Sequence, residues 1–135
     1  MKASQQPDGE ALIYAGNAAA EGAQDGRRGW FLGHFRASES GLPHSEDVEM
    51  KWGIHRQGEE KTALAANRTA FTLSILISGA FAVWFPEQAR EVVLADAGDY
   101  VLFAPGVAHT WRALEDTVIL SVRWPSVPED QQPLA

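Results

Sequence analysis

The chain contains no cysteine, and basic residues are much scarcer than acidic ones. The absence of cysteine excludes disulfides, thiolate metal ligands and cysteine nucleophiles, and it is typical of a reducing compartment. Eleven Lys and Arg residues against eighteen Asp and Glu residues give a formal net charge of −7. Because nucleic-acid binding draws most of its affinity from basic side chains on phosphates, we expect no nucleic-acid partner.

Long apolar runs are also missing. The longest ones, such as 80–85, are far too short to span a bilayer, so we expect no membrane partner. No apolar run follows the charged first eight residues, so we expect no secretory signal and assign the chain to the cytoplasm. What the chain does have is 135 residues with 45% apolar content, enough for one domain with a core and not for two.

The two ends differ in composition from the middle. Residues 1–27 are rich in Ala, Gly, Gln and Asn, which predicts a partly flexible N-terminal arm with a short helix near residues 10–20. Residues 126–135 form a proline-rich, charged C-terminal tail that we expect to be extended or frayed. The folded domain is then expected over residues 28–125.

Between these ends the sequence favours short strands. Apolar side chains occupy alternate positions of 47–55 and of 71–78, the period of a half-buried strand. Other short runs with strand character are 30–36, 81–85, 91–94, 100–104 and 117–124. Turn-forming residues separate several of them, and no useful helical period follows residue 28. The fold class predicted is all-β, a sandwich or barrel of antiparallel strands.

Residues 98–109 combine turn residues and a histidine at a characteristic spacing. Gly98-Asp99 precedes a strand, Pro105-Gly106 ends it, and His109 follows three residues later. This spacing resembles the second signature of the cupin superfamily, although the proline abuts the glycine and Ala113 stands where that family has an asparagine. The resemblance implies a cupin-type double-stranded β-helix, a jelly-roll barrel, with the histidine as a metal ligand at its mouth.

The first cupin signature is only partly present. It consists of a His-x-His pair, a Glu a few residues later, and a closing Gly seven residues after that Glu. If Gly79 is the closing glycine, Thr72 stands at the Glu position. If His55 is instead the second histidine, Glu59 or Glu60 falls at the Glu spacing. The two registers disagree, and the sequence leaves the choice open.

The resemblance therefore implies two alternative sites. One is a reduced triad of His55, Glu59 and His109 that holds a divalent metal (Fe, Mn, Zn or Ni) with positions left open for substrate or oxygen. The other is a pocket lined by Thr72, with His109 as the only member of the ligand set. Residues 48–124 also look similar to a group of small stand-alone cupins that mostly lack an assigned activity.

Strand alternation adds two residues to the candidate pocket. Lys51 lies on the same strand face as His55, so both side chains point into the barrel or both point out. If they point inward, Glu49 does too, and the result is a polar ligand site. Trp111 follows His109 by two residues and is expected to wall the same cavity.

The outward face of one strand predicts an interface. If Thr72 faces the lumen, the alternate residues of its strand face outward, namely Phe71, Leu73, Ile75 and Ile77. Such an apolar stripe has to be covered by the N-terminal segment or by another subunit, so we expect a homodimer.

Two functional classes follow. The first is a metal-dependent enzyme of the dioxygenase, isomerase or epimerase type, in which a metal on His55 and His109 polarises a substrate oxygen. The second is a non-catalytic, metal-free protein that binds or senses a small molecule, in which Arg112 or Arg123 either fixes an anionic ligand or lies in water. A structural module with a filled pocket is a weaker alternative. Fold does not decide among these, and we favour a cupin that binds a metal or a small polar ligand, without a named activity or catalytic residue.

Overall fold

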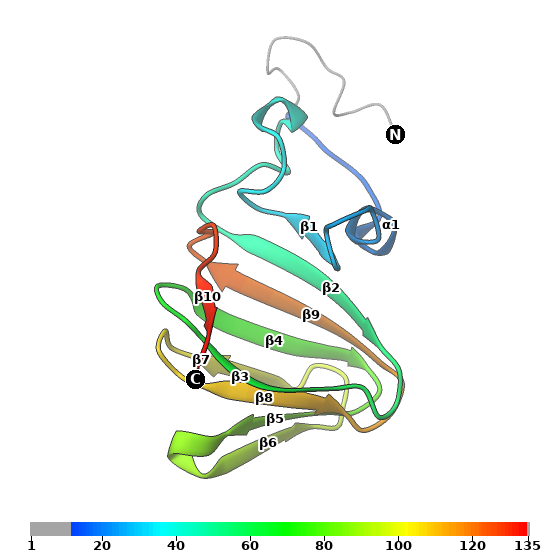
Figure 1. Cartoon of the computed structure of the whole chain (residues 1–135). Coiled ribbons are helices and arrows are strands. Elements are labelled where there is room, and N and C mark those ends of the chain that lie inside the picture. The colour runs from blue at the N-terminus through cyan, green and yellow to red at the C-terminus, as the bar shows by residue number, and fades with distance from the viewer. Residues whose placement is uncertain (1–11, 135) are drawn as a thin grey trace.

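The computed structural model describes residues 12–134, and its regular structure is mainly β-strand (Figure 1). The predicted N-terminal arm therefore lies partly outside the described residues. The elements are α1 (Ala18–Gly22), β1 (Trp30–Leu32), η3 (Ser38–Ser40), β2 (Glu49–His55), β3 (Glu60–Asn67), β4 (Phe71–Ser78), β5 (Phe81–Phe85), η4 (Pro86–Gln88), β6 (Arg90–Leu94), β7 (Tyr100–Phe103), β8 (His109–Ala113), β9 (Thr117–Trp124) and β10 (Gln131–Pro133). Within residues 12–134, no helix has the length and apolar character needed to cross a bilayer.

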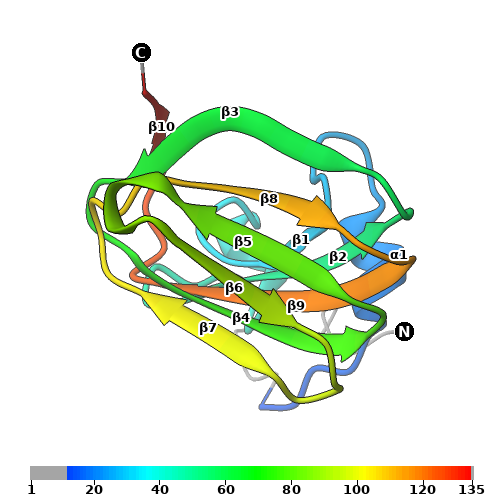
Figure 2. The same cartoon turned by 90° about the horizontal axis from the view of Figure 1, so that it is seen from below.

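The strands form two five-stranded sheets that face each other (Figure 2). The first has the order β1-β2-β9-β4-β7, and the second has the order β10-β3-β8-β5-β6. Neighbouring strands pair antiparallel in both sheets. The prediction of an all-β fold with antiparallel strands is confirmed.

Alternation along β4 sets which side chains reach the space between the sheets. Thr72 and Leu76 are buried on the inner face, whereas Phe71 and Ile77 are about 40% exposed on the outer face (42% and 41%). The outward stripe predicted from the sequence is therefore present. An apolar core fills one end of the space between the sheets: Leu76, Phe81, Val83, Phe85, Leu94, Val101, Ala113 and Ile119. Each large apolar side chain buried there contributes about 1.5–3 kcal/mol.

The turns of the 98–109 segment have the geometry that the motif predicts. Gly98 and Gly106 adopt φ values of +95° and +84°, a region that favours glycine. Strand β7 lies between these turns, and β8 begins at His109. The motif therefore returns the chain from one sheet to the other and starts β8 with a histidine that is 7% exposed.

Two strands were not predicted. β3 has a run of alanines in place of alternating large apolar residues, which explains why its pattern is weak. β10 lies in the proline-rich tail, which is extended and pairs with β3 through Gln131 and Asn67. The tail is anchored by the Asp130 carboxylate, which accepts hydrogen bonds from the backbone N–H groups of Thr69 (3.0 Å) and Ala70 (2.9 Å).

Candidate functional site

A cavity of about 490 Å³ lies between the two sheets, next to the packed core. The first sheet lines it with Lys51, Gly53, His55, Thr72, Ser74, Phe103, Ile119, Ser121 and Arg123. The second sheet lines it with Lys61, Phe81, Val83, His109, Trp111 and Gln131. The loop before β1 adds residues 26–28 and the start of β1 adds Trp30. Five of the six candidate residues from the sequence line this cavity, and Glu59 does not.

The polar end of the cavity is built by the register of β2, β9 and β4. Arg123 on β9 stands opposite Glu49 on one side and Thr72 on the other. Two residues away on the same face of β9, Ser121 stands between Lys51 and Ser74, and the two serine hydroxyls lie 2.8 Å apart. The period-two alternation thus makes one wall of the cavity from two cations and three hydroxyl groups, all on the inner face of the sheet.

Positive charge dominates the lining. Lys51, Lys61 and Arg123 face the cavity, with Arg27 and Arg28 from the preceding loop, and no Asp or Glu side chain lines it in the part of the chain that the structure describes. Burial is the main cause that lowers the pKa of Lys51 to about 8, and repulsion from its cationic neighbours adds to the shift. Burial lowers the pKa of Lys61 as well. The protein therefore confines several like charges in one cavity.

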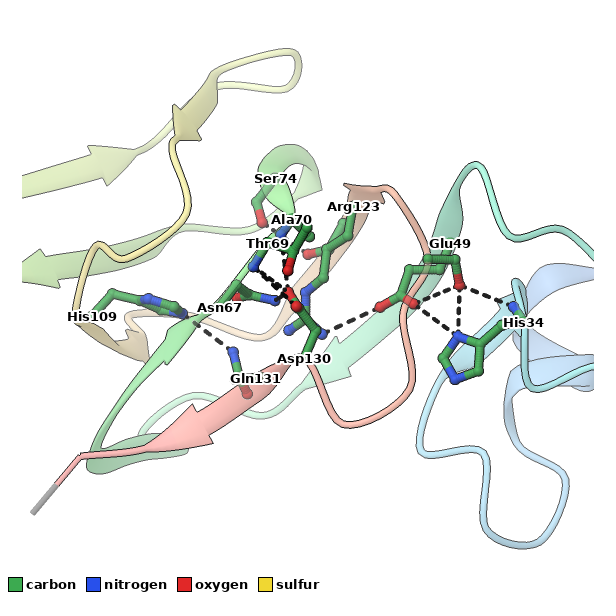
Figure 3. Close-up of polar contacts among 12 residues, drawn as sticks. His34, Glu49, Asn67, Thr69, Ala70, Ser74, His109, Arg123, Asp130 and Gln131 are labelled. Carbon is green, nitrogen blue, oxygen red and sulfur yellow. Dashed lines mark hydrogen bonds and ion pairs between the residues drawn. The ribbon is translucent and has the colours of Figure 1, made fainter.

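Arg123 is held in place by a buried network behind the cavity wall (Figure 3). Its guanidinium lies 3.3 Å from Glu49 Oε2 and 4.6 Å from the centre of the Trp30 ring. The other Glu49 oxygen accepts a hydrogen bond of 2.7 Å from the Ser126 hydroxyl. His34 contacts that hydroxyl through Nδ1 at 2.7 Å, so the segment after β1 and the segment after β9 both meet at Glu49.

Some polar atoms of the cavity residues have no partner in the described chain. They are Thr72 Oγ1, Arg123 Nε and Arg27 Nη1, all buried from solvent. Thr72 is only 5% exposed and lines the cavity. Buried polar groups are nearly always hydrogen-bonded, so these atoms indicate capacity for a bound polar molecule.

The wall formed by the second sheet is aromatic. Phe81 and Trp111 stack with their ring centres 5.2 Å apart, and His55 from the first sheet lies 4.5 Å from the Trp111 ring. His109 lies 4.6 Å from Phe103, the last residue of β7. This wall offers planar apolar surface to a ligand, and it contrasts with the hydroxyl-bearing wall opposite.

The predicted metal ligands are only partly brought together. His55 and His109 both line the cavity, but Glu59 has a 47% exposed side chain and binds the back of His55, with its Oε1 3.1 Å from Nδ1. The Nδ1–H of His109 donates to the Val107 carbonyl at 3.0 Å. Among the described residues, no group of three or more His, Cys, Asp or Glu residues is placed to hold a metal ion. The protein donors therefore do not fit the three-ligand site implied by the resemblance, and metal binding stays a prediction.

Strand β10 completes the cavity at the C-terminal end of the chain. The Gln131 side chain accepts a hydrogen bond from Lys61 Nζ (3.0 Å) and lies 3.5 Å from His109 Nε2. Burial lowers the pKa of His109, and the positive charge of Lys61 and Arg123 lowers it further, outweighing the backbone contact to Val107. These surroundings favour the neutral form of the His109 imidazole.

Sequence reasoning missed Lys61 and Gln131. Both lie on strands that the hydropathy pattern does not reveal, so neither could be placed on an inner face. For Arg123, the sequence left open whether the side chain binds a ligand or lies in solvent. Its alternation with Ser121 along β9, read together with Lys51 on β2, is the signal that indicates a cationic wall.

No protein-family model matches this chain, and no curated protein matches it in sequence. Solved structures resemble it in fold. KdgF from Halomonas sp. superposes with a TM-score of 0.56 at 20% identity, over 64% of this chain and 76% of that one. An uncharacterized conserved protein with a double-stranded β-helix domain from Klebsiella pneumoniae gives a TM-score of 0.57 at 19% identity, over 67% and 77% of the two chains.

A third similar structure is an RmlC-like cupin from Desulfovibrio desulfuricans, with a TM-score of 0.53 at 17% identity, over 62% of this chain and 76% of that one. Identities this low carry the fold and not the activity. The two facing antiparallel sheets, the glycine turns on either side of β7 and these likenesses agree with one another. This chain has the cupin fold, a double-stranded β-helix, and resembles small cupins without an assigned activity.

Proposed function

We propose that the cavity binds a small organic anion, such as a carboxylate or a phosphate monoester, through Lys51, Lys61 and Arg123. The observation that carries this proposal is the lining: these cations share one cavity that no described Asp or Glu side chain lines. Glu49 neutralises Arg123 from behind the cavity wall, whereas Lys51 and Lys61 make no ion pair with the described residues. Burying a charge without a counter-ion is costly, and a bound anion offsets that cost. The cavity is positive although the chain as a whole carries a net charge of −7.

The two walls suggest the shape of the ligand. The anionic group fits the wall of Lys51 and Arg123, where Thr72 Oγ1 has no partner. A planar or apolar portion fits the rings of Phe81 and Trp111 on the opposite wall. A cavity of about 490 Å³ is within the range of sites for small molecules. We therefore favour a small acid with an apolar or planar part over inorganic phosphate alone.

Calorimetric titration with malonate, benzoate and inorganic phosphate tests the proposal. Arg123→Met should weaken binding of the best of these anions about 30-fold, because a charge-assisted hydrogen bond contributes roughly 2 kcal/mol. Arg112→Met is the matched control, since Arg112 points outward on β8 with a 54% exposed side chain. Binding in the control should equal that of the unaltered protein.

Two results would contradict the proposal. One is the absence of heat with all three anions at low ionic strength, where attraction between charges is least screened. The other is equal affinity in the Arg123→Met and Arg112→Met variants, which would place the anion outside the cavity.

A metal-binding function is the second candidate, because both cavity histidines have their Nδ1 atoms occupied. The Nδ1–H of His55 donates to Glu59, and that of His109 donates to the Val107 carbonyl. This arrangement leaves Nε2 of each ring able to bind a metal. Metal analysis of protein purified without a histidine tag, repeated on His109→Ala, separates the candidates. Stoichiometric metal that is lost in the variant supports a metal site. The absence of metal from both proteins would contradict the metal-binding function.

Association into a homodimer also stays a proposal. The outer face of the first sheet exposes Phe71 and Ile77 on β4, Tyr100 and Leu102 on β7, and Trp124 on β9. Register places Leu102 beside Leu73, so the strands form a continuous apolar surface of the kind that a second copy of the chain covers. Sedimentation equilibrium should give a dimer for the unaltered chain and a monomer for Leu102→Asp. A monomer in both cases contradicts the proposal.

A further inference from the structure

Lys51 differs from the other lysine of the cavity in having no acceptor for its ammonium group. Lys61 Nζ donates to Gln131 Oε1 at 3.0 Å. Lys51 Nζ makes no hydrogen bond or ion pair to the described residues. It lies 5.9 Å from the centre of the Trp30 ring. The two lysines thus share a cavity, but only the ammonium group of Lys61 has a hydrogen-bond acceptor.

The surroundings of Lys51 raise the fraction of its neutral amine above that of an ordinary lysine. Burial is the larger cause of a pKa of about 8, and three cations, Arg123, Arg28 and Lys61, lower it further. An amine with this pKa carries a free lone pair on a substantial fraction of molecules near neutral pH. Desolvation next to other cations is a known way to turn a lysine into a nucleophile.

We propose that Lys51 Nζ forms a Schiff base with the carbonyl carbon of a small oxo acid bound in the cavity. This rests on the proposed anion binding, because the carboxylate of the oxo acid needs Arg123 or Lys61 to hold it. The substrate class is thereby narrowed to acids with an aldehyde or ketone next to, or near, the carboxylate. Lys51 is assigned as the residue that makes a bond to the ligand.

The step balances without a redox partner. The Nζ lone pair adds to the carbonyl carbon, the C=O π electrons move to oxygen, and a proton transfers from nitrogen to oxygen to give a carbinolamine. The hydroxyl then takes up a proton and leaves as water while the nitrogen lone pair closes the C=N bond. Loss of the remaining N–H proton gives the neutral imine and returns the proton that was taken up. Ser121 stands opposite Lys51 on β9, and its hydroxyl lies 2.8 Å from the Ser74 hydroxyl. This hydroxyl pair lies on the same wall as Lys51 and is placed to relay the protons that the step transfers.

Reductive trapping tests the proposal. The full chain is incubated with glyoxylate and sodium cyanoborohydride near pH 7.5, and adducts are located by intact mass and peptide mapping. The chain has three lysines, Lys2, Lys51 and Lys61, so each site is resolved. We expect one saturable adduct on Lys51, formed at least about tenfold faster than on Lys61.

Two conservative variants serve as controls. Lys51→Arg keeps the positive charge but cannot form an imine, so the adduct should disappear while glycolate, the matching acid without a carbonyl, still binds by calorimetry. Arg112→Met, whose side chain lies outside the cavity, should keep the adduct on Lys51. Glycolate added to the trapping reaction should slow it.

The outcomes separate this proposal from the anion-binding one. If glycolate or malonate binds but no adduct forms on Lys51, or if adducts form equally on all three lysines, the Schiff base is wrong and anion binding stands. If no anion binds to the unaltered protein, anion binding is wrong, and the Schiff-base proposal falls with it.

Discussion

The two inner walls of the cavity are made by the same alternation of strand side chains, yet they differ in chemistry. The wall from β2, β9 and β4 carries Lys51, Arg123 and hydroxyl groups, and its polar atoms are only partly satisfied. The opposite wall carries Phe81 and Trp111, stacked on each other and continuous with the core. The first wall is built at a cost to stability and the second provides stability, which is the division expected when one fold serves both binding and folding.

The largest expected effect is on the aromatic wall. Phe81→Ala should lower the free energy of unfolding by about 3–5 kcal/mol, because it leaves a cavity beside Trp111. Urea unfolding measures this loss, and Val93→Ala is the control since Val93 is 48% exposed on β6. Affinity of the folded fraction for malonate, which has no planar part to pack on Phe81, should stay within about threefold, since the proposed carboxylate contacts are made by Lys51, Lys61 and Arg123. A loss below about 1 kcal/mol would mean that this wall is not part of the core.

The cationic wall should respond in the opposite direction. Lys51→Met removes a buried ammonium whose pKa is lowered to about 8, so the ligand-free protein should gain about 3 kcal/mol of stability at pH 7. The folded chain binds fewer protons than the unfolded chain between about pH 8 and pH 10, so the stability of the unaltered protein should rise over that window. The variant should lose this part of the rise. Urea unfolding at several pH values measures both, and a destabilised variant at pH 7 would contradict the comparison.

Anion affinity should fall as the pH rises above about 8. A bound anion raises the pKa of Lys51, so binding takes up a proton where the free protein has lost one, and affinity should drop about tenfold between about pH 7.5 and pH 9.5. Calorimetry with malonate across this range measures the drop. Lys51→Arg should flatten the profile because arginine stays charged. An unchanged profile in that variant would show that Lys51 does not contact the anion.

The smallest expected effect concerns β10, the edge strand of the second sheet. Gln131→Ala removes the acceptor of Lys61, so that lysine is freed to contact the ligand, and affinity should change by no more than about threefold. Asp130→Ala is the informative partner variant, because it removes the carboxylate that holds β10 to Thr69 and Ala70. It should destabilise the protein by about 2 kcal/mol. If Gln131→Ala weakens anion binding as much as Arg123→Met does, the surface that contacts the anion extends to β10.

Sequence patterns alone predicted the fold class and several members of the site. The period-two alternation of 47–55 and 71–78 is local, so it fixed which side chains share a strand face without knowledge of strand partners. The spacing from Gly98 to His109 is local as well, and it predicted two turns, while the family resemblance placed His109 at the barrel mouth. Lys51 and Trp111 followed from alternation as candidate pocket residues, Thr72 followed from the family resemblance, and all three line the cavity.

Tertiary structure decided the rest, because strand pairing depends on contacts between residues far apart in the chain. Only the register of β2 with β9 shows that Glu49 pairs with Arg123 and leaves Lys51 without an acceptor. Only the pairing of β3 with β8 and β10 brings Lys61 and Gln131 to the cavity, since neither strand has a strong hydropathy pattern. The sequence thus predicted an all-β fold and showed which residues share a strand face, and the three-dimensional pairing decided that Lys51, Lys61 and Arg123 face one cavity.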